Sequence, residues 1–237
     1  LAVISDVHSN IEALDAVLYD ISSQEADRIV CLGDNIGYGP DPEKVIKKLQ
    51  EFRITAVQGN HEYALLNSSY KSRFNPESAK ALDINKKMLS IDALEYISSL
   101  NTNAVCHDAL FIHGISLILI DGYLFNLPDD ELISRTKALQ KTVIFVGHTH
   151  QLGIYEIKGN CVNKKKLKEK HVLSKNSCTI VNAGSVGQPR SMDHEAAYVI
   201  WDTENNEVEP KLVEYDYQFT AFKIRRAGIP ERFADVL

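Results

Sequence analysis

The sequence predicts an α/β fold, and two observations carry that prediction. In the first sixty or so residues, short apolar runs that end in polar loops alternate with segments whose apolar residues recur at helical spacing. After about residue 150, short runs rich in Val, Ile and Thr follow one another with little helical pattern. We therefore expect a first half built from βαβ units with parallel strands, and a second half rich in β-strands.

The first half is expected to contain three strands joined by two helices. The strands are predicted, in order, over 1–5, 28–32 and 54–58. The first helix is expected to begin at Ser9, because Glu12 stands three residues further on, as in a capping box. The second is expected to begin at Asp41-Pro42, a capping residue followed by a first-turn proline.

The middle of the chain is predicted to be mostly helical. A long helical segment is expected to follow Asn75-Pro76, with its apolar face formed by Ala81, Ile84, Met88 and Ile91. Strands are predicted around 105 and over 109–112, and a helix with an acidic first turn after Pro128. The apolar stretch 115–127 fits neither pattern.

The C-terminal part is expected to be β-rich and to end in a helix from about residue 218. Its strands are predicted over 142–146, 154–157, 171–173, 179–181, 197–201 and 208–213. We see no internal repeat and no low-complexity linker. The simplest organisation is one domain that spans residues 1–237.

Composition and charge limit the partners that the protein is expected to have. The net charge of −6 and a pI near 5.8 do not favour an extended nucleic-acid interface. The Lys-rich run 163–170 is therefore interpreted as an exposed hairpin turn. No apolar run is long enough to cross a bilayer, and 1–5 is predicted as strand without a basic leader. The four cysteines form no Cys-x-x-Cys pair, which favours reduced thiols and a cytoplasmic location.

Side chains that can bind metal ions follow five of the predicted strands. They are Asp6 and His8, Asp34, Asn60, His113, and His148 and His150. This mixture of carboxylate, imidazole and amide suits Mn, Fe, Co, Ni or Zn, and contains too much imidazole for Mg or Ca. The ligands are too many for one tetrahedral site, so we expect two divalent ions with a carboxylate between them. Within each Asp-x-His or His-x-His pair, strand geometry predicts that both side chains point to the same side.

These motifs, taken in order, resemble the calcineurin-like metallophosphoesterase superfamily. The motifs are Asp6-x-His8, Gly33-Asp34, Gly59-Asn60-His61-Glu62, His113 and Gly147-His148-x-His150. Residues 182–190 and 226–230 resemble its small bacterial and archaeal phosphodiesterase-like branch, so the resemblance covers almost the whole chain. It implies a two-sheet β-sandwich flanked by helices, with a dinuclear metal site at one end.

The resemblance also implies a role for each residue of these motifs. One ion would be held by Asp6, His8, Asp34 and His150, and the other by Asp34, Asn60, His113 and His148, with Asp34 bridging. His61 occupies the position of the family's catalytic histidine. The implied reaction is hydrolysis of a phosphodiester or nucleotide-like phosphate ester by a metal-bridging hydroxide, with His61 assisting the leaving oxygen. Glu62 is expected either to orient His61 or to cap the helix that follows.

The residues after Asp34 narrow the expected substrate. Protein Ser/Thr phosphatases of the superfamily carry Asp-Arg-Gly where this chain has Gly37-Tyr38-Gly39, which argues against a protein phosphatase. Ap4A-type dinucleoside polyphosphate hydrolases carry Arg-Gly-Pro there, so that activity remains an alternative if Arg190 supplies the positive charge. Tyr38 and Arg190 are therefore the candidate substrate contacts. A non-catalytic scaffold, like the related retromer subunit, predicts eroded ligands or a lost histidine, which this sequence does not show.

Overall fold

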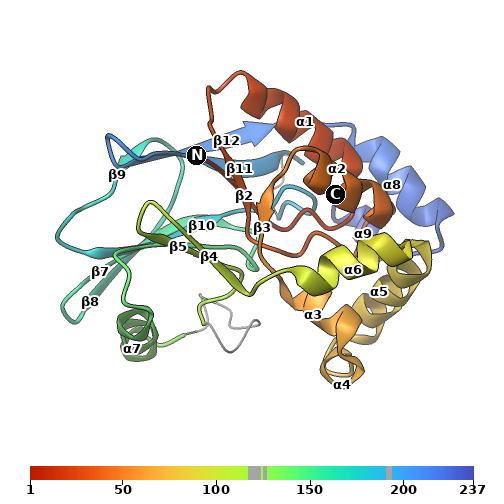
Figure 1. The fold of residues 1–237 in the computed structure, drawn as a ribbon, viewed down its shortest axis with the longest axis horizontal. Coiled ribbons are helices and arrows are strands. Elements are labelled where there is room, and N and C mark those ends of the chain that lie inside the picture. Colours follow the sequence, from red (N-terminus) through yellow and green to blue (C-terminus); the bar gives the residue numbers. More distant parts are fainter. Residues whose placement is uncertain (117–123, 125–126, 191–193) are drawn as a thin grey trace.

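Two mixed β-sheets form the centre of the molecule in a computed structural model that describes residues 1–116, 124, 127–190 and 194–237 (Figure 1). The first sheet has the strand order β3 (Thr55–Ala56), β2 (Ile29–Cys31), β1 (Ala2–Ile4), β11 (Ala196–Asp202), β12 (Glu207–Val213) and β9 (His171–Val172). The second has the order β4 (Asn103–Cys106), β5 (Ala109–Ile112), β6 (Val143–Val146), β10 (Cys178–Ala183), β7 (Leu152–Lys158) and β8 (Cys161–Lys166).

The predicted βαβαβ unit forms half of the first sheet. Strands β1, β2 and β3 are parallel neighbours, connected by α1 (Ile11–Ser22) and α2 (Pro42–Glu51). Strand β11 adds to the other side of β1 in antiparallel orientation, which places the C-terminal part of the chain beside its first strand. In the second sheet β5, β6 and β10 are parallel. The carboxyl ends of the parallel strands therefore point to one edge of each sheet.

Apolar side chains of both sheets meet in a shared core. Val3, Val30 and Val199 from the first sheet pack in one cluster with Phe111 and Phe145 from the second, whose rings stack at 5.0 Å. Helices α1 and α2 cover the outer face of the first sheet. Helix α7 (Asp129–Leu139) packs on the second sheet, apart from the other helices (Figure 1). This is the two-sheet sandwich flanked by helices that the sequence motifs implied.

Two expectations about helix boundaries are wrong. Helix α1 is capped by Asn10, whose Oδ1 accepts the N–H of Ala13, because Ser9 lies in the left-handed region (φ 55°) and its hydroxyl donates to Asn85. The long helical segment is two helices, α5 (Pro76–Met88) and α6 (Ile91–Ser99). The break is at Leu89, which is extended, and Ser90 caps the second helix. Ile91, predicted to be buried, is exposed.

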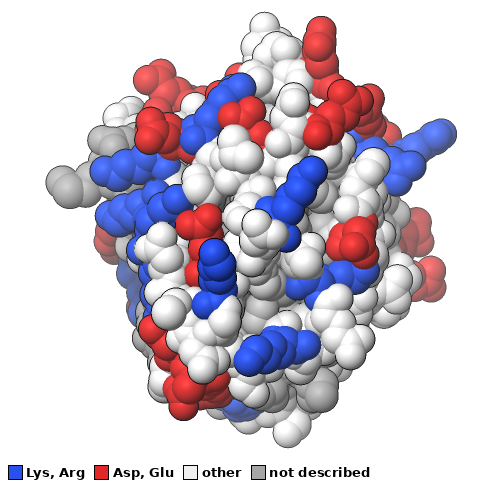
Figure 2. Space-filling model, turned by 90° about the vertical axis from the view of Figure 1, so that its left-hand side faces the viewer, with Lys and Arg blue, Asp and Glu red and all other residues white. Residues whose placement is uncertain are grey.

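The Lys-rich run is not a hairpin turn. Strand β8 continues to Lys166 along the edge of the second sheet, and the turn lies before it, around Gly159. Exposed lysines on an edge strand oppose pairing with another chain. Figure 2, which views the molecule from this side, shows Lys and Arg interspersed with Asp and Glu rather than gathered into one basic surface. Most of the stretch 115–127 lies outside the described residues, among which no helix is long and apolar enough to cross a membrane.

Candidate active site

The loops after β1, β2, β3, β5 and β6 bring all the predicted ligand residues together. They are Asp6 and His8, Asp34, Asn60, His113, and His148 and His150, and His61 lies among them. Asn60 and His61 begin α3 (Asn60–Leu66) directly after β3. Each of these eight side chains is at most 7% exposed. The loops come from both sheets, so it is the packing of the two sheets that makes neighbours of residues more than a hundred positions apart, such as Asp6, whose Oδ2 accepts the main-chain N–H of His148.

Most of these residues adopt an uncommon backbone conformation. Positive φ values of 48° to 66° occur at Asp6, His8, Asp34, His148 and His150. Left-handed conformations of non-glycine residues cost energy and concentrate at functional sites. The two side chains of each Asp-x-His or His-x-His pair therefore converge because the chain turns sharply after the strand. The expectation that strand alternation points them to the same side is wrong.

Asp6, His8 and His150 form the first group of potential ligands. The Nε2 atom of His150 lies 3.2 Å from Asp6 Oδ1 and 3.1 Å from Nε2 of His8. The Nδ1 atoms of the two histidines face main-chain carbonyls, at 3.1 Å from Ile36 and 2.8 Å from Gln188. In the tautomer that these partners favour, the proton lies on Nδ1 of each ring and the Nε2 lone pairs face each other.

Asp34, His113 and His148 form a second group, with Asn60 beside it. The Nε2 atom of His113 lies 3.2 Å from Asp34 Oδ2, 2.9 Å from Asn60 Oδ1 and 3.2 Å from His148 Nδ1. The Nδ1 atom of His113 faces the carbonyl of Leu32 at 2.9 Å. This contact orients the ring so that Nε2 points into the cluster.

Asp34 connects the two groups. Its Oδ2 atom lies 3.9 Å from Nε2 of both His8 and His61, and 3.2 Å from Nε2 of His113. Its other oxygen, Oδ1, accepts the main-chain N–H of His61 at 2.8 Å. One oxygen is thus held by the protein backbone while the other faces imidazoles of both groups. This is the position that a bridging carboxylate would need.

The cluster fits divalent cations by the chemistry of its atoms. The lone pairs of His8 and His150 point at each other, and within the described part of the chain the buried Oδ1 of Asp6 has no hydrogen-bond donor. Buried acceptors that lack donors are costly unless a cation lies between them. The mixture of imidazole, carboxylate and amide oxygen suits first-row transition ions.

Electrostatics favour the metal-binding form of Asp34, His148 and His8 but not of His113: burial lowers the pKa of His113, but the carboxylate of Asp34 outweighs it and raises that pKa to about 9, so a metal ion would displace a proton there. Burial by itself raises the pKa of Asp34, but His113 and His61 outweigh it and hold that pKa well below its usual range. Burial, together with His113, lowers the pKa of His148 to about 4, and burial lowers the pKa of His8 well below its usual value. Near neutral pH the carboxylate is therefore ionised and these two imidazoles are neutral, which are the forms that bind metal ions.

Glu62 does not contact His61 with its side chain. Its carboxylate accepts four main-chain N–H groups, from Gly59 at 2.8 Å, Asp34 at 3.0 Å, Asn35 at 2.7 Å and Ile36 at 3.2 Å. Gly59 is the N-cap of α3, and the contact of its N–H with Glu62 caps the helix, so the capping expectation holds. The other three hold the Asp34 loop against the start of α3, which the sequence did not indicate.

Gly37 and Tyr38 surround the ring of His61. A Cβ atom on Gly37 would lie 2.0 Å from Nδ1 of His61, so only glycine leaves room for the ring. The Tyr38 ring lies 4.4 Å from that of His8 and 4.5 Å from that of His61, between centroids. Phe233, from the C-terminal α9 (Arg232–Asp235), stacks on Tyr38 at 4.5 Å. The candidate contact Tyr38 is therefore packed directly against the histidines of the cluster.

Two cavities reach the cluster. The smaller, about 250 Å³, is lined by Asn60, His61, His148 and Tyr38, and by residues that the sequence did not mark as part of the site, among them Tyr70, Arg73 and Phe74. Tyr70 belongs to α4 (Ser68–Lys71), and the other two follow it. The larger cavity, about 520 Å³, is lined by His150 and by the candidate contact Arg190. No motif marked the residues after α4, because only the packing of α3 and α4 places them beside His61.

The fold and the cluster together define a metallophosphoesterase. The family model of the calcineurin-like phosphoesterase superfamily domain matches residues 1–206, and the chain belongs to that superfamily. It is 34% identical over 236 residues to an uncharacterized protein of Methanocaldococcus jannaschii. The aligned region covers 98% of this chain and 94% of that protein.

Two solved structures share the fold over almost their whole length. A metallophosphoesterase from Sphaerobacter thermophilus is 31% identical, with a TM-score of 0.82 over 98% of this chain and 96% of that chain. A hypothetical protein from Pyrococcus horikoshii is 19% identical, with a TM-score of 0.80 over 100% of this chain and 96% of that chain. The second similarity shows the fold alone. The resemblance that the motifs indicated is thus confirmed.

Proposed function

We propose that this protein is a metal-dependent phosphodiesterase that cleaves small, nucleotide-like phosphate esters. The observation that carries the proposal is the position of Asp34, whose Oδ2 lies 3.2 Å from Nε2 of His113 in its own group of potential ligands and 3.9 Å from Nε2 of His8 in the other group. The residues proposed for one ion are Asp6, His8, Asp34 and His150, and those for the other are Asp34, Asn60, His113 and His148. When bound, two such ions supply an activated water and neutralise the charge on the phosphate oxygens.

His61 is proposed to assist the departure of the leaving group. Its main-chain N–H is bonded to Asp34, and its buried ring lines the smaller cavity. The ring is therefore held at a fixed position next to the site where the scissile phosphate would bind. From there an imidazole can donate a proton or a hydrogen bond to the oxygen that leaves.

The Tyr38 side chain is expected to favour hydrolysis of phosphodiesters over phosphomonoesters. Tyr38 occupies the position where protein phosphatases of the superfamily carry an arginine, and it packs on His8 and His61. A phenol ring offers no positive charge to the second negative charge of a phosphate monoester, whereas an arginine does so with two parallel hydrogen bonds. A dinucleoside polyphosphate hydrolase remains a second candidate, because Arg190 shares the larger cavity with His150.

The proposal is tested by removing and restoring metal. Protein treated with a chelator is reloaded separately with Mn, Fe, Co, Ni or Zn and assayed on bis(p-nitrophenyl) phosphate, p-nitrophenyl phosphate and diadenosine tetraphosphate. We expect hydrolysis to disappear on chelation and to return with at least one ion. Asp34→Asn protein, purified in parallel, controls for contaminating phosphatases. Hydrolysis that survives chelation, or that no ion restores, would contradict the proposal.

A further inference from the structure

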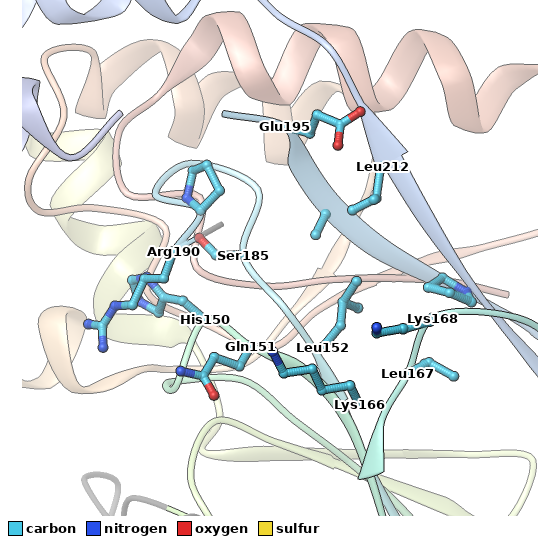
Figure 3. A pocket seen from close by; sticks show the side chains of 13 residues that line it. His150, Gln151, Leu152, Lys166, Leu167, Lys168, Ser185, Arg190, Glu195 and Leu212 are labelled. Carbon is cyan, nitrogen blue, oxygen red and sulfur yellow. The ribbon is translucent and has the colours of Figure 1, made fainter. Parts of the chain in front are cut away.

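The larger cavity is lined by basic and apolar side chains that the proposed hydrolysis does not by itself require. Figure 3 shows His150 and Arg190 toward one end of it and Leu167 and Lys168 toward the other. We call it the lysine cavity and define it by Lys166, Lys168, Arg190, Glu195 and the apolar residues between them, which are Leu152, Leu167, Pro189, Ala197, Pro210 and Leu212. It begins at a proposed metal ligand and extends away from the metal cluster.

The basic side chains of this cavity form no ion pair with a described residue, whereas the neighbouring lysines on β8 do. Lys164 pairs with Asp129 at 2.6 Å, and Lys165 with Glu156 at 3.6 Å. No described residue forms an ion pair with Lys166, Lys168 or Arg190, and Glu195 is the one carboxylate in the cavity lining. The lining thus contains three cationic side chains and one anionic side chain, which favours a ligand that carries negative charge.

The apolar part of the cavity favours a ligand that also has a ring or a similar apolar body. Leu167 is buried below the cavity, and Leu212 is 55% exposed beside it. A volume of about 520 Å³ lies within the range of roughly 300–1,000 Å³ that is usual for small-molecule sites, whereas the smaller cavity, about 250 Å³, lies below it. The bulkier part of a substrate therefore fits the lysine cavity.

The two cavities meet the metal cluster at different histidines. His148 and His61 line the smaller cavity, and His150 lines the lysine cavity. A phosphodiester has two substituents on phosphorus, one that leaves and one that is retained. If His61 donates to the leaving oxygen, the leaving group occupies the smaller cavity. The retained substituent then extends past His150.

We infer that the lysine cavity binds the retained substituent, and that this substituent is a nucleoside bearing at least one further phosphate. The apolar residues contact the base or sugar, and Lys166 and Lys168, which lie away from His150, bind the additional phosphate. The inference rests on the proposed function, because it takes the direction of the substrate from the role of His61.

The test compares two substrates that share a leaving group. Both are p-nitrophenyl esters of thymidine 5′-phosphate, and one carries an additional 3′-phosphate. The K166A/K168A variant removes two charges from the cavity. The matched control, K164A/K165A, removes the same charge from two neighbouring lysines, both on β8, that pair with Asp129 and Glu156.

We expect K166A/K168A to raise KM about tenfold for the ester with the 3′-phosphate, because hydrogen bonds to charged groups are worth enough for such a change. KM for the other ester and kcat for both are expected to stay near wild-type values, and the control variant to resemble wild type. Equal changes for both esters, or the same change in the control, would overturn the inference.

A binding measurement separates this inference from the proposed function. Calorimetry with thymidine 3′,5′-bisphosphate, which cannot be turned over as a diester, is expected to give a Kd about tenfold weaker in K166A/K168A than in the control. An unchanged Kd would overturn the assignment of the lysine cavity even in an active enzyme. Absence of hydrolysis of either ester, with the Kd difference present, would overturn the proposed function and leave the anion site in place.

Discussion

The carboxylate of Glu62 accepts the main-chain N–H of Asp34 at 3.0 Å. Glu62, which is not itself a proposed metal ligand, thus holds the loop that carries Asp34. Three more N–H groups, from Asn35, Ile36 and Gly59, share the same carboxylate. The side chain is fully buried. Four main-chain donors on one carboxylate leave little freedom for the loop between β2 and Tyr38, and the geometry of the metal cluster depends on that loop.

Replacing Glu62 with Gln is therefore expected to destabilise the protein. An amide has one acceptor oxygen, so some of the four N–H groups would be left buried without an acceptor, at a cost of about 1–3 kcal/mol. The free energy of unfolding, measured by urea denaturation, checks this. Glu43→Gln is the control: Glu43 also accepts a main-chain N–H, from Ser90, but at an exposed site, so its loss is expected to cost less. Equal costs for the two variants would contradict the proposed role of Glu62.

Asp34→Asn is expected to reduce the binding of both proposed ions. An amide offers one oxygen and no negative charge, and Asp34 faces histidines of both ligand groups. Even residues that only support a ligand change metal affinity by about 10- to 100-fold, so a shared ligand should matter at least as much. Elemental analysis of the purified variant measures it, with His8→Ala and His113→Ala as variants that should each mainly affect one ion. Two tightly held ions in Asp34→Asn would rule out bridging.

Diester hydrolysis is expected to compete well with monoester hydrolysis. The reason is Tyr38, which offers no positive charge to a phosphate dianion beside His8 and His61. The measurement is kcat/KM for bis(p-nitrophenyl) phosphate, a dinucleotide, and a phosphoserine peptide. Faster turnover of the phosphoserine peptide than of any diester would show that another residue binds the dianion.

His61→Ala is expected to affect substrates according to their leaving groups. A nitrophenolate leaves readily as an anion, whereas a ribose alkoxide needs a proton. General-acid assistance is typically worth about 10²- to 10⁴-fold, so cleavage of a dinucleotide should fall by that order and cleavage of a nitrophenyl ester by much less. Bound metal, measured by elemental analysis, should be unchanged. Similar losses for both substrates would instead indicate that His61 only orients the phosphate.

The cysteines are expected to differ strongly in reactivity. Cys31 is buried, its thiol donates to Asn35 Oδ1 at 2.9 Å, and burial raises its pKa, so little thiolate forms. Cys161 is exposed on strand β8. Iodoacetamide should therefore modify Cys161 in the native protein and Cys31 only after unfolding, as peptide mass spectrometry would show. Native labelling of both at the same rate would mean that the β2 loop opens readily.

The sequence by itself determined where most strands lie along the chain and which residues are candidate ligands. Each candidate, from Asp6 to His150, stands directly after an apolar run. A buried strand is recognisable locally, and its carboxyl end in a parallel sheet is placed by the sheet itself. Side chains that follow the parallel strands of one sheet therefore lie along one edge, although the packing of the two sheets is what joins the two edges. The same local signals predicted that a helix follows Asn75-Pro76, and the side chain of Asn75 caps that helix by accepting the N–H of Ser78.

Only the tertiary structure decided which groups surround those ligands. Ser9 and Asn10 are both good helix caps by composition, and the contact of Ser9 with Asn85, 76 positions away, leaves the cap to Asn10. Glu62 reaches its donors, and Lys166 and Lys168 come to line a cavity with Arg190, through packing of distant segments. Local propensity contains no information on such contacts, because their energies arise only when the two sheets and their helices have packed together.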